Sequence, residues 1–115
     1  MVTLPGLGGE LGILPGHTPL ISQLQTGVLS YAKGEHTFQL HVSGGFVEVN
    51  DDRVSVLAEI AELPEEIDAA RARLARDHME KTLNSWNGTE EDFEQARVKL
   101  ERSIVRLQLA HGAKN

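Results

Sequence analysis

Cysteine is absent from this sequence of 115 residues, which excludes a disulfide framework, a thiol nucleophile and a cysteine-ligated metal centre. Aromatic residues are scarce, at 4% of the chain against an apolar share of 40%, so the expected core is aliphatic. The uninterrupted apolar runs are only a few residues long, and none is long enough to cross a bilayer. A charged-then-apolar leader is also missing, so we expect no secretory signal.

Basic residues are rare in the first half of the chain. Most of the net charge of −6 arises in residues 1–63, where seven acidic side chains accompany two basic ones. A nucleic-acid partner needs a basic face that neutralises its phosphates, so we expect no such partner. Residues 64–115 are nearly neutral but densely charged, which is typical of exposed helices.

The first 63 residues have the alternating pattern of antiparallel strands. In HTFQLHVS, residues 36–43, apolar side chains occupy every second position, and GFVEVN and RVSVLAE alternate in a similar way. Turn signals lie between these segments at short intervals: Pro15-Gly16, Thr26-Gly27, Lys33-Gly34-Glu35, Ser43-Gly44-Gly45 and Asn50-Asp51-Asp52. Many short strands separated by turns predict an antiparallel β-sandwich over residues 1–63.

The pattern changes at Pro64, a residue type that is tolerated at the start of a helix and is followed here by acidic side chains that the helix dipole favours. We predict one helix from Pro64 to about Leu83 and a second after Thr89, which resembles a capping box together with Asp92. The first helix has an apolar stripe of Ile67, Ala70 and Leu74, and an adjoining small-residue stripe of Ala69, Ala72, Ala75 and Met79. The second helix has one apolar stripe, which consists of Phe93, Ala96, Leu100, Ile104 and Leu107. The short loop between them predicts an antiparallel helical hairpin over residues 64–115.

The predicted hairpin has mostly alanine at its contact and therefore buries little apolar area. At about 25 cal/mol/Å², this burial barely offsets the entropy that is lost when two helices become ordered. The hairpin needs a further surface, either the sandwich or a partner. The hairpin is therefore a candidate for a segment that changes its position.

The glycine-rich stretch GLGGELGILPGHTPL, residues 6–20, does not form a phosphate-binding loop. Leu11 stands where G-x-G-x-x-G needs its third glycine, and no Gly-Lys-Ser or Gly-Lys-Thr follows. We interpret the glycines as tight bends between strands. The histidine spacing indicates no metal site, because His36 and His41 are five residues apart and point to opposite faces of a strand. We therefore assign no metal ligand and no catalytic residue.

One set of charged residues is placed to act together. Asp68 and Arg71 open the first helix, and the second helix carries Arg97, Arg102 and Arg106. In an antiparallel hairpin, late residues of the second helix lie beside the start of the first. Two interpretations remain open. One is a solvated salt-bridge seam worth about 0.3–0.5 kcal/mol per pair. The other is a nucleotide clamp in which arginines bind phosphates and Asp68 binds the base or sugar.

Three motifs, in this order, resemble the epsilon subunit family of the F-type proton-translocating ATP synthase: GELGILPGHTPL at 9–20, VSGGFVEVNDDRVSVLAEIAE at 42–62 and IDAARA at 67–72. The resemblance covers essentially all 115 residues. It implies a β-sandwich that docks on the gamma subunit and the c-ring, followed by a helical hairpin. The hairpin folds down, or extends along gamma into the catalytic alpha/beta head and blocks ATP hydrolysis.

The resemblance implies a non-catalytic rotor subunit that couples proton flow to ATP synthesis and requires no cofactor. Such a subunit is peripheral, at the cytoplasmic face of the bacterial inner membrane, which it reaches only through the complex. Family members begin with a further strand and most of its partner, so we expect a sandwich that lacks its first strand and leaves an edge open. The alternative function is a free-standing ATP-sensing regulatory protein, for which the IDAARA motif and the arginines provide the support.

Specific residues follow from the resemblance. In some bacterial members ATP is a regulatory ligand of the folded hairpin, and the matching positions are Glu62, Ile67, Asp68, Arg71, Ala72, Arg102 and Arg106. His78 stands where the family carries a further arginine. Glu10 is placed in a loop that faces the c-ring, and the same segment carries His17.

Overall fold

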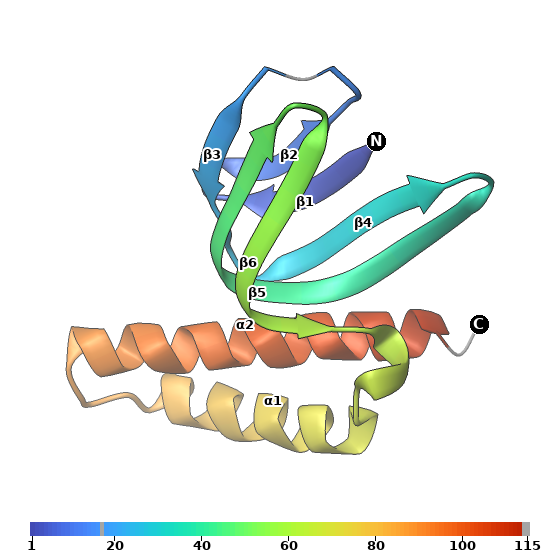
Figure 1. The fold of residues 1–115 in the computed structure, drawn as a ribbon. Helices are drawn as coiled ribbons and strands as arrows, with labels where there is room; N and C mark the ends of the chain where they lie inside the picture. The colour runs from blue at the N-terminus through green and yellow to red at the C-terminus, as the bar shows by residue number, and fades with distance from the viewer. Residues whose placement is uncertain (17, 114–115) are drawn as a thin grey trace. The chain divides into compact units, whose positions relative to one another are not determined.

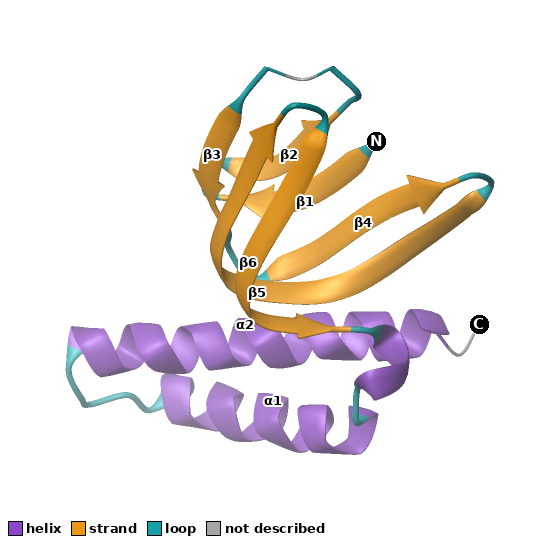
Figure 2. Ribbon diagram, viewed as in Figure 1, coloured by secondary structure: helices purple, strands orange, loops and turns teal. Residues whose placement is uncertain are grey.

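A computed structural model describes residues 1–16 and 18–113 of the chain. It contains two compact units, residues 1–63 and residues 64–115. The first unit consists of strands and the second of helices (Figures 1 and 2). This architecture confirms the predicted fold class, an antiparallel β-sandwich followed by a pair of helices.

The first unit is an antiparallel sheet in the strand order β2-β1-β4-β5-β3, with β6 also paired to β5. A backbone bridge between Gly6 and Leu24 links the end of β1 to the residue after β3. The sheet therefore curls into two layers that share the long strand β5 (Figure 1). The strands are β1 Val2–Gly6, β2 Gly9–Ile13, β3 Leu20–Gln23, β4 Gly27–Lys33, β5 His36–Asn50 and β6 Arg53–Glu62.

Strand β5 runs unbroken through Ser43-Gly44-Gly45, where the sequence predicted a turn. That prediction was wrong, because the ladder to β6 continues on both sides of the glycines, with Ser43 opposite Ile60 and Gly45 opposite Ala58. The backbone φ angles of Gly44 and Gly45 are 72° and 104°, values that favour glycine. The two glycines therefore bend the strand instead of ending it.

The bend allows β5 to contribute to the core from both of its parts. Side chains alternate along a regular strand, so Val42 and Val47 would point to opposite faces. Both are fully buried in one core cluster, which lies between the two layers. The buried members of this cluster are Leu4, Ile13, Leu24, Leu29, Val42, Val47 and Val49. The core is aliphatic, as the composition predicted.

The glycine-rich start of the chain forms bends between strands, as the sequence predicted. Gly6 pairs with Gly9, so that β1 and β2 form a hairpin with Leu7 and Gly8 at its tip. At the other end of the unit, Asn50 pairs with Arg53, and the β5–β6 hairpin turns through Asp51 and Asp52.

The second unit begins with a short 3-10 turn, η1 (Pro64–Glu66), and continues with α1 (Ala69–Asn84) and α2 (Glu90–Ala113). The predicted start of the first helix at Pro64 was therefore too early. Asp68 is the N-cap of α1, and its extended backbone, with ψ at 100°, separates η1 from the helix. The start of α2 agrees with the prediction, because Thr89 Oγ1 accepts a hydrogen bond from Asp92 N at 3.1 Å.

The two helices pack along one another as an antiparallel pair, and α2 also contacts η1 (Figure 1). On α1 the buried residue is Ala72, whereas Leu74 is 72% exposed. The small-residue stripe, and not the stripe that contains Leu74, therefore belongs to the buried face of α1.

Trp86 organises the loop between the helices. Its Nε1 donates a hydrogen bond to the backbone oxygen of Thr89 at 3.1 Å. Its ring meets Phe93 edge-on, with ring centroids 5.8 Å apart. Gly88 leaves room for this ring, since a Cβ at Gly88 would lie 2.8 Å from a Trp86 carbon. Trp86 thus holds the loop against the first turn of α2.

Candidate functional site

The candidate site begins at the start of the helical hairpin. Asp68 is exposed, and its Oδ1 accepts a hydrogen bond from the backbone nitrogen of Arg71 at 3.1 Å. This bond explains why the helix starts where it does, because the first N–H groups of a helix have no partner within it. A carboxylate has a second oxygen with further acceptor capacity, so capping leaves Asp68 able to accept from a ligand.

The remaining residues of the IDAARA motif divide between packing and solvent. Ala72 is 4% exposed and belongs to the packed face of α1, while Ile67 is half-buried in the turn before Asp68. Arg71 is exposed. Arg71 is thus the basic side chain that this motif offers to an anion in solvent.

Two further arginines are on α2. Arg102 and Arg106 are four residues apart, which places them on one face of the helix, and both are half-buried. The antiparallel packing of the hairpin brings this half of α2 beside the start of α1 (Figure 1). Arg102 also lines an open groove of about 530 Å³ along α2, together with Glu91, Glu94, Gln95, Val98 and Lys99.

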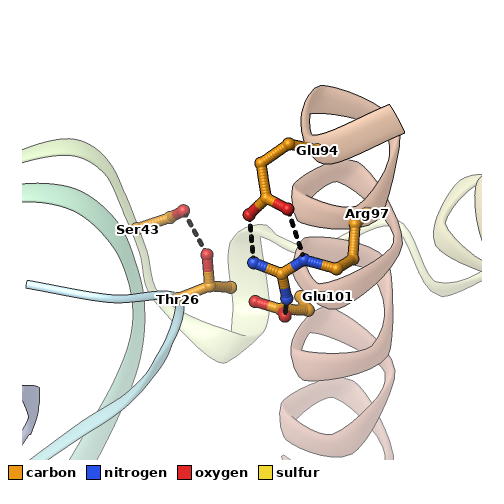
Figure 3. Close-up of polar contacts among 5 residues, drawn as sticks. All are labelled: Thr26, Ser43, Glu94, Arg97 and Glu101. Carbon is orange, nitrogen blue, oxygen red and sulfur yellow. Dashed lines mark hydrogen bonds and ion pairs between the residues drawn. The ribbon is translucent and has the colours of Figure 1, made fainter. Parts of the chain in front are cut away.

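The third arginine of the second helix, Arg97, is engaged by acidic neighbours on its own helix. It forms ion pairs with Glu94, one turn earlier, and with Glu101, one turn later (Figure 3). The side-chain hydrogen bond from Arg97 lowers the pKa of the Glu94 carboxyl. Arg97 therefore stabilises α2 itself, through ion pairs within one helix.

Glu62 is the last residue of β6 and lies in the first unit. Its Oε1 is 2.7 Å from Nδ1 of His41, which faces it across the β5–β6 ladder. The His41 side chain is 0% exposed and the Glu62 side chain 28% exposed. Sequence reasoning missed His41, which was considered only as a metal ligand.

The His41–Glu62 pair lies in a polar part of the β5–β6 ladder. The next pair toward the bend is Ser43 with Ile60. Ser43 is buried, and its hydroxyl is 2.7 Å from the hydroxyl of Thr26 (Figure 3). This end of the ladder therefore presents hydrogen-bonding groups, whereas the end near Asp51 presents valines.

Glu10 lies in strand β2, opposite Pro5, and is exposed. The expectation that it occupies a loop was wrong, because the turn through Leu7 and Gly8 is tight enough for pairing to continue from Gly9 onward. His17 lies outside the described residues. His78 is exposed on α1, and its backbone oxygen accepts a hydrogen bond from Thr82 Oγ1 at 2.8 Å.

Among residues 1–16 and 18–113, no three histidine or acidic side chains are grouped so that they could hold a metal ion. Within the same ranges, no helix is both long enough and apolar enough to span a bilayer.

The candidate site residues of the hairpin are a carboxylate and guanidinium groups, which bind phosphates and hydroxyls through charge-assisted hydrogen bonds.

Comparison with protein families gives two adjacent matches. The family described as "ATP synthase, Delta/Epsilon chain, beta-sandwich domain" matches residues 1–64. The family described as "ATP synthase, Delta/Epsilon chain, long alpha-helix domain" matches residues 65–111. The two matches together cover nearly the whole chain, in the order in which the sandwich and the helices occur.

Individual relatives agree with the family matches. The chain is 46% identical over 110 residues to the ATP synthase epsilon chain of Halalkalibacterium halodurans, covering 96% of this chain and 83% of that one. It is 48% identical over 107 residues to the ATP synthase epsilon chain of Alkalihalophilus pseudofirmus, with coverage of 93% and 80%. A chain in the Euglena gracilis mitochondrial ATP synthase, solved as the OSCP/F1/c-ring assembly, matches with a TM-score of 0.77 and 28% identity. That match covers 99% of this chain and 69% of the other.

Proposed function

The chain belongs to the ATP synthase delta/epsilon chain family, and from this premise we propose that it is a central-stalk rotor subunit that couples proton flow to ATP synthesis. The observation that carries the proposal is the succession of both family domains in one chain of the matching fold. The subunit performs no catalysis itself. Its place is the cytoplasmic face of a bacterial membrane, to which it is bound through the complex.

The sandwich is the docking unit for the gamma subunit in this proposal. Phe46 and Leu57 face each other across β5 and β6, and both are more than half exposed. Ile21, on the neighbouring strand β3, is 72% exposed. A cluster of exposed apolar side chains supports a protein partner, because such patches are rare on free surfaces.

Copurification tests this docking. We expect the wild-type chain to retain the gamma subunit. The Leu57→Ser chain should retain less gamma or none. Leu14→Ser is the matched control, because Leu14 is exposed but lies outside the β5–β6 ladder. Failure of the wild-type chain to retain gamma, together with ATP binding, would favour a free-standing ATP-sensing regulator instead.

We further propose that the β1–β2 end of the sandwich faces the c-ring. Glu10 is exposed there, and the tip of the hairpin beside it carries Leu7, which is 64% exposed. A cysteine introduced at Glu10 should then crosslink to the c-ring in the assembled complex. Crosslinks to the alpha/beta head alone would reverse the proposed orientation.

The helical hairpin is the inhibitory element in the proposal. Its α1 buries alanine where a stable helix pair would bury larger side chains, so little apolar area holds it in one place. Such an element can extend toward the alpha/beta head and block ATP hydrolysis there. A complex with a chain that ends at Leu63 should hydrolyse ATP faster than the complex with the full chain. Equal hydrolysis rates, with the truncated chain still bound, would rule out the inhibitory role.

ATP is the proposed regulatory ligand of the hairpin. Its phosphates accept hydrogen bonds from Arg71, Arg102 and Arg106. Asp68 accepts a hydrogen bond from its base or sugar. Each charge-assisted contact is worth roughly 1.5–3 kcal/mol. ATP binding favours the folded hairpin only to the extent that it binds that form more tightly than the extended one.

Calorimetry of the isolated chain with ATP, with and without magnesium, tests this ligand. We expect saturable binding in the millimolar range or below, and no turnover of the nucleotide. His78 stands where a further arginine is expected, so the affinity should be modest. The absence of heat at millimolar ATP would rule out the nucleotide site.

A further inference from the structure

The loop between α1 and α2 contains the sequence Trp86-Asn87-Gly88-Thr89. Asn87 and Gly88 are exposed and belong to neither helix, since α1 ends at Asn84 and α2 begins at Glu90. In the part of the chain that the structure describes, no hydrogen bond engages the Asn87 side chain or the Gly88 backbone nitrogen. Both groups are therefore free to react with each other and with water.

A glycine that follows an asparagine leaves the asparagine amide open to attack. The attacking atom is the backbone nitrogen of the following residue, and in other residue types a Cβ shields that nitrogen. Gly88 has no Cβ. The loop also requires glycine here, because a Cβ at Gly88 would lie 2.8 Å from Cζ2 of Trp86. The packing of the Trp86 ring therefore keeps a reactive Asn-Gly pair in the loop.

We propose that Asn87 is a site of spontaneous deamidation, and that the isoaspartate formed there releases Trp86 from its contacts in the loop. The reacting groups all belong to the helical unit. Water is the only co-reactant, and neither a nucleotide nor a partner subunit takes part.

The reaction has two steps. In the first, the Gly88 nitrogen forms a bond to Cγ of Asn87, and the bond from Cγ to Nδ2 breaks. The Nδ2 group leaves as ammonia with the proton that the Gly88 nitrogen gives up, and a five-membered succinimide remains. In the second, water opens this ring. Cleavage of the new bond to Cγ gives aspartate, whereas cleavage of the original peptide bond gives isoaspartate, in which the main chain runs through Cγ.

The contacts of Trp86 enclose the reacting residues. Its Nε1 donates to the backbone oxygen of Thr89 at 3.1 Å, which closes the loop across Asn87 and Gly88. Its ring is also edge-on to Phe93, with ring centroids 5.8 Å apart. Isoaspartate lengthens the main chain by one methylene inside this closed segment. The hydrogen bond and the ring contact cannot both keep their geometry, so the indole moves toward solvent.

Both products also add one negative charge before the first turn of α2, where three acidic side chains already lie: Glu90, Glu91 and Asp92. The aspartate product has this charge with an unchanged main chain. The variant Asn87→Asp therefore reproduces the charge alone. Any larger displacement of Trp86 in the deamidated protein is due to the longer main chain of isoaspartate.

The test incubates the full chain at pH 6 and at pH 8 and then digests it with trypsin for mass spectrometry. Residues 82–97 form one tryptic peptide, which carries both Asn84 and Asn87. Fragmentation of this peptide should place the conversion of amide to acid at Asn87. Asn84 is the internal control, because Ser85 follows it, and it should keep its amide. Methylation by an isoaspartyl methyltransferase identifies the isoaspartate product.

The conversion should be faster at pH 8 than at pH 6, because the attacking nitrogen must lose its proton. Asn87→Gln is the matched variant, since glutamine keeps an exposed amide but would have to form a larger ring. This variant should keep its amide over the same incubation. Circular dichroism before incubation should show the same helical content in Asn87→Gln, Asn87→Asp and the wild type.

Hydrogen exchange of the Trp86 indole N–H, followed by NMR, measures the release of the loop. The exchange should become faster in the incubated wild type, by more than in Asn87→Asp, and should stay unchanged in Asn87→Gln. An intact Asn87 amide after incubation at pH 8, or equal conversion at Asn84, overturns the proposed site. Isoaspartate at Asn87 with unchanged exchange of the indole N–H overturns the proposed release of Trp86.

Discussion

Gly45 lies so close to the backbone of Leu57 that a Cβ at Gly45 would stand 1.8 Å from the Leu57 carbonyl oxygen. The Gly45 carbonyl also accepts a hydrogen bond from Leu24 N at 2.9 Å. Glycine at this position therefore lets β6 approach the bend of β5 closely. The two layers of the sandwich depend on this approach.

Gly45→Ala should destabilise the sandwich by about 3 kcal/mol or more, because the clash adds to the strain of a positive φ for a residue with a Cβ. Gly8→Ala is the control, since a Cβ there meets nothing within 4 Å. Urea unfolding followed by circular dichroism compares the two. A Gly45→Ala protein as stable as Gly8→Ala would contradict the described bend.

Asp51→Gly should stabilise the sandwich by about 0.5–1 kcal/mol, because Asp51 adopts the left-handed conformation that glycine occupies without strain. Its φ is 51°. The neighbouring Asp52 is left unchanged, since its Oδ1 accepts from Gly16 N at 2.9 Å. Glu35→Gly, in the two-residue turn of the β4–β5 hairpin, is the control and should stabilise nothing, because Gly34 already supplies the positive φ there. The free energy of unfolding in urea decides between them.

Arg102→Ala and Arg106→Ala should each weaken ATP binding at least about tenfold, because each removes a charge-assisted contact to phosphate. Lys99→Ala is the control, an exposed positive charge on the same helix that the proposed site does not use. Isothermal calorimetry gives the affinities. If the two variants weaken ATP binding no more than Lys99→Ala does, the arginines belong to a surface salt-bridge seam, where such a change costs under about 1 kcal/mol.

The pKa of Glu94 is lowered mainly by the hydrogen bond from Arg97, so Arg97→Gln should raise it toward the ordinary glutamate value. A carboxyl with a lowered pKa stabilises the fold above its unfolded-state pKa, and this contribution is lost as the pH falls through the folded-state pKa. The wild-type hairpin should therefore lose helical content in acid more steeply than Arg97→Gln. Carboxyl chemical shifts in an NMR titration measure the pKa directly. Lys99→Gln should leave the titration of Glu94 unchanged.

Local chemistry made much of this fold predictable. Thr89 and Asp92 marked the start of the second helix, and Asp51-Asp52 marked a hairpin tip. The register that brings His41 to Glu62 was also within reach, because a two-residue turn at Asp51-Asp52 fixes every pair along β5 and β6.

Other features depend on tertiary packing and could not be found from periodicity. Ser43-Gly44-Gly45 has the composition of a turn, and only the continued ladder to β6 shows it to be a bend within a strand. Leu74 has the spacing of a core residue, yet the helices pack through Ala72. In glycine-rich segments and alanine-rich helices, alternative turns and alternative buried faces are close in energy. Packing against neighbouring elements then determines which of them forms.

The position of Trp86 has an optical consequence. It is the single tryptophan of the sequence and lies in the loop between α1 and α2, edge-on to Phe93. The sandwich contains no tryptophan, so the indole emission reports on the hairpin loop without interference from the strands. A quencher or an acceptor dye can therefore follow this loop in the isolated chain, with the native indole as the donor.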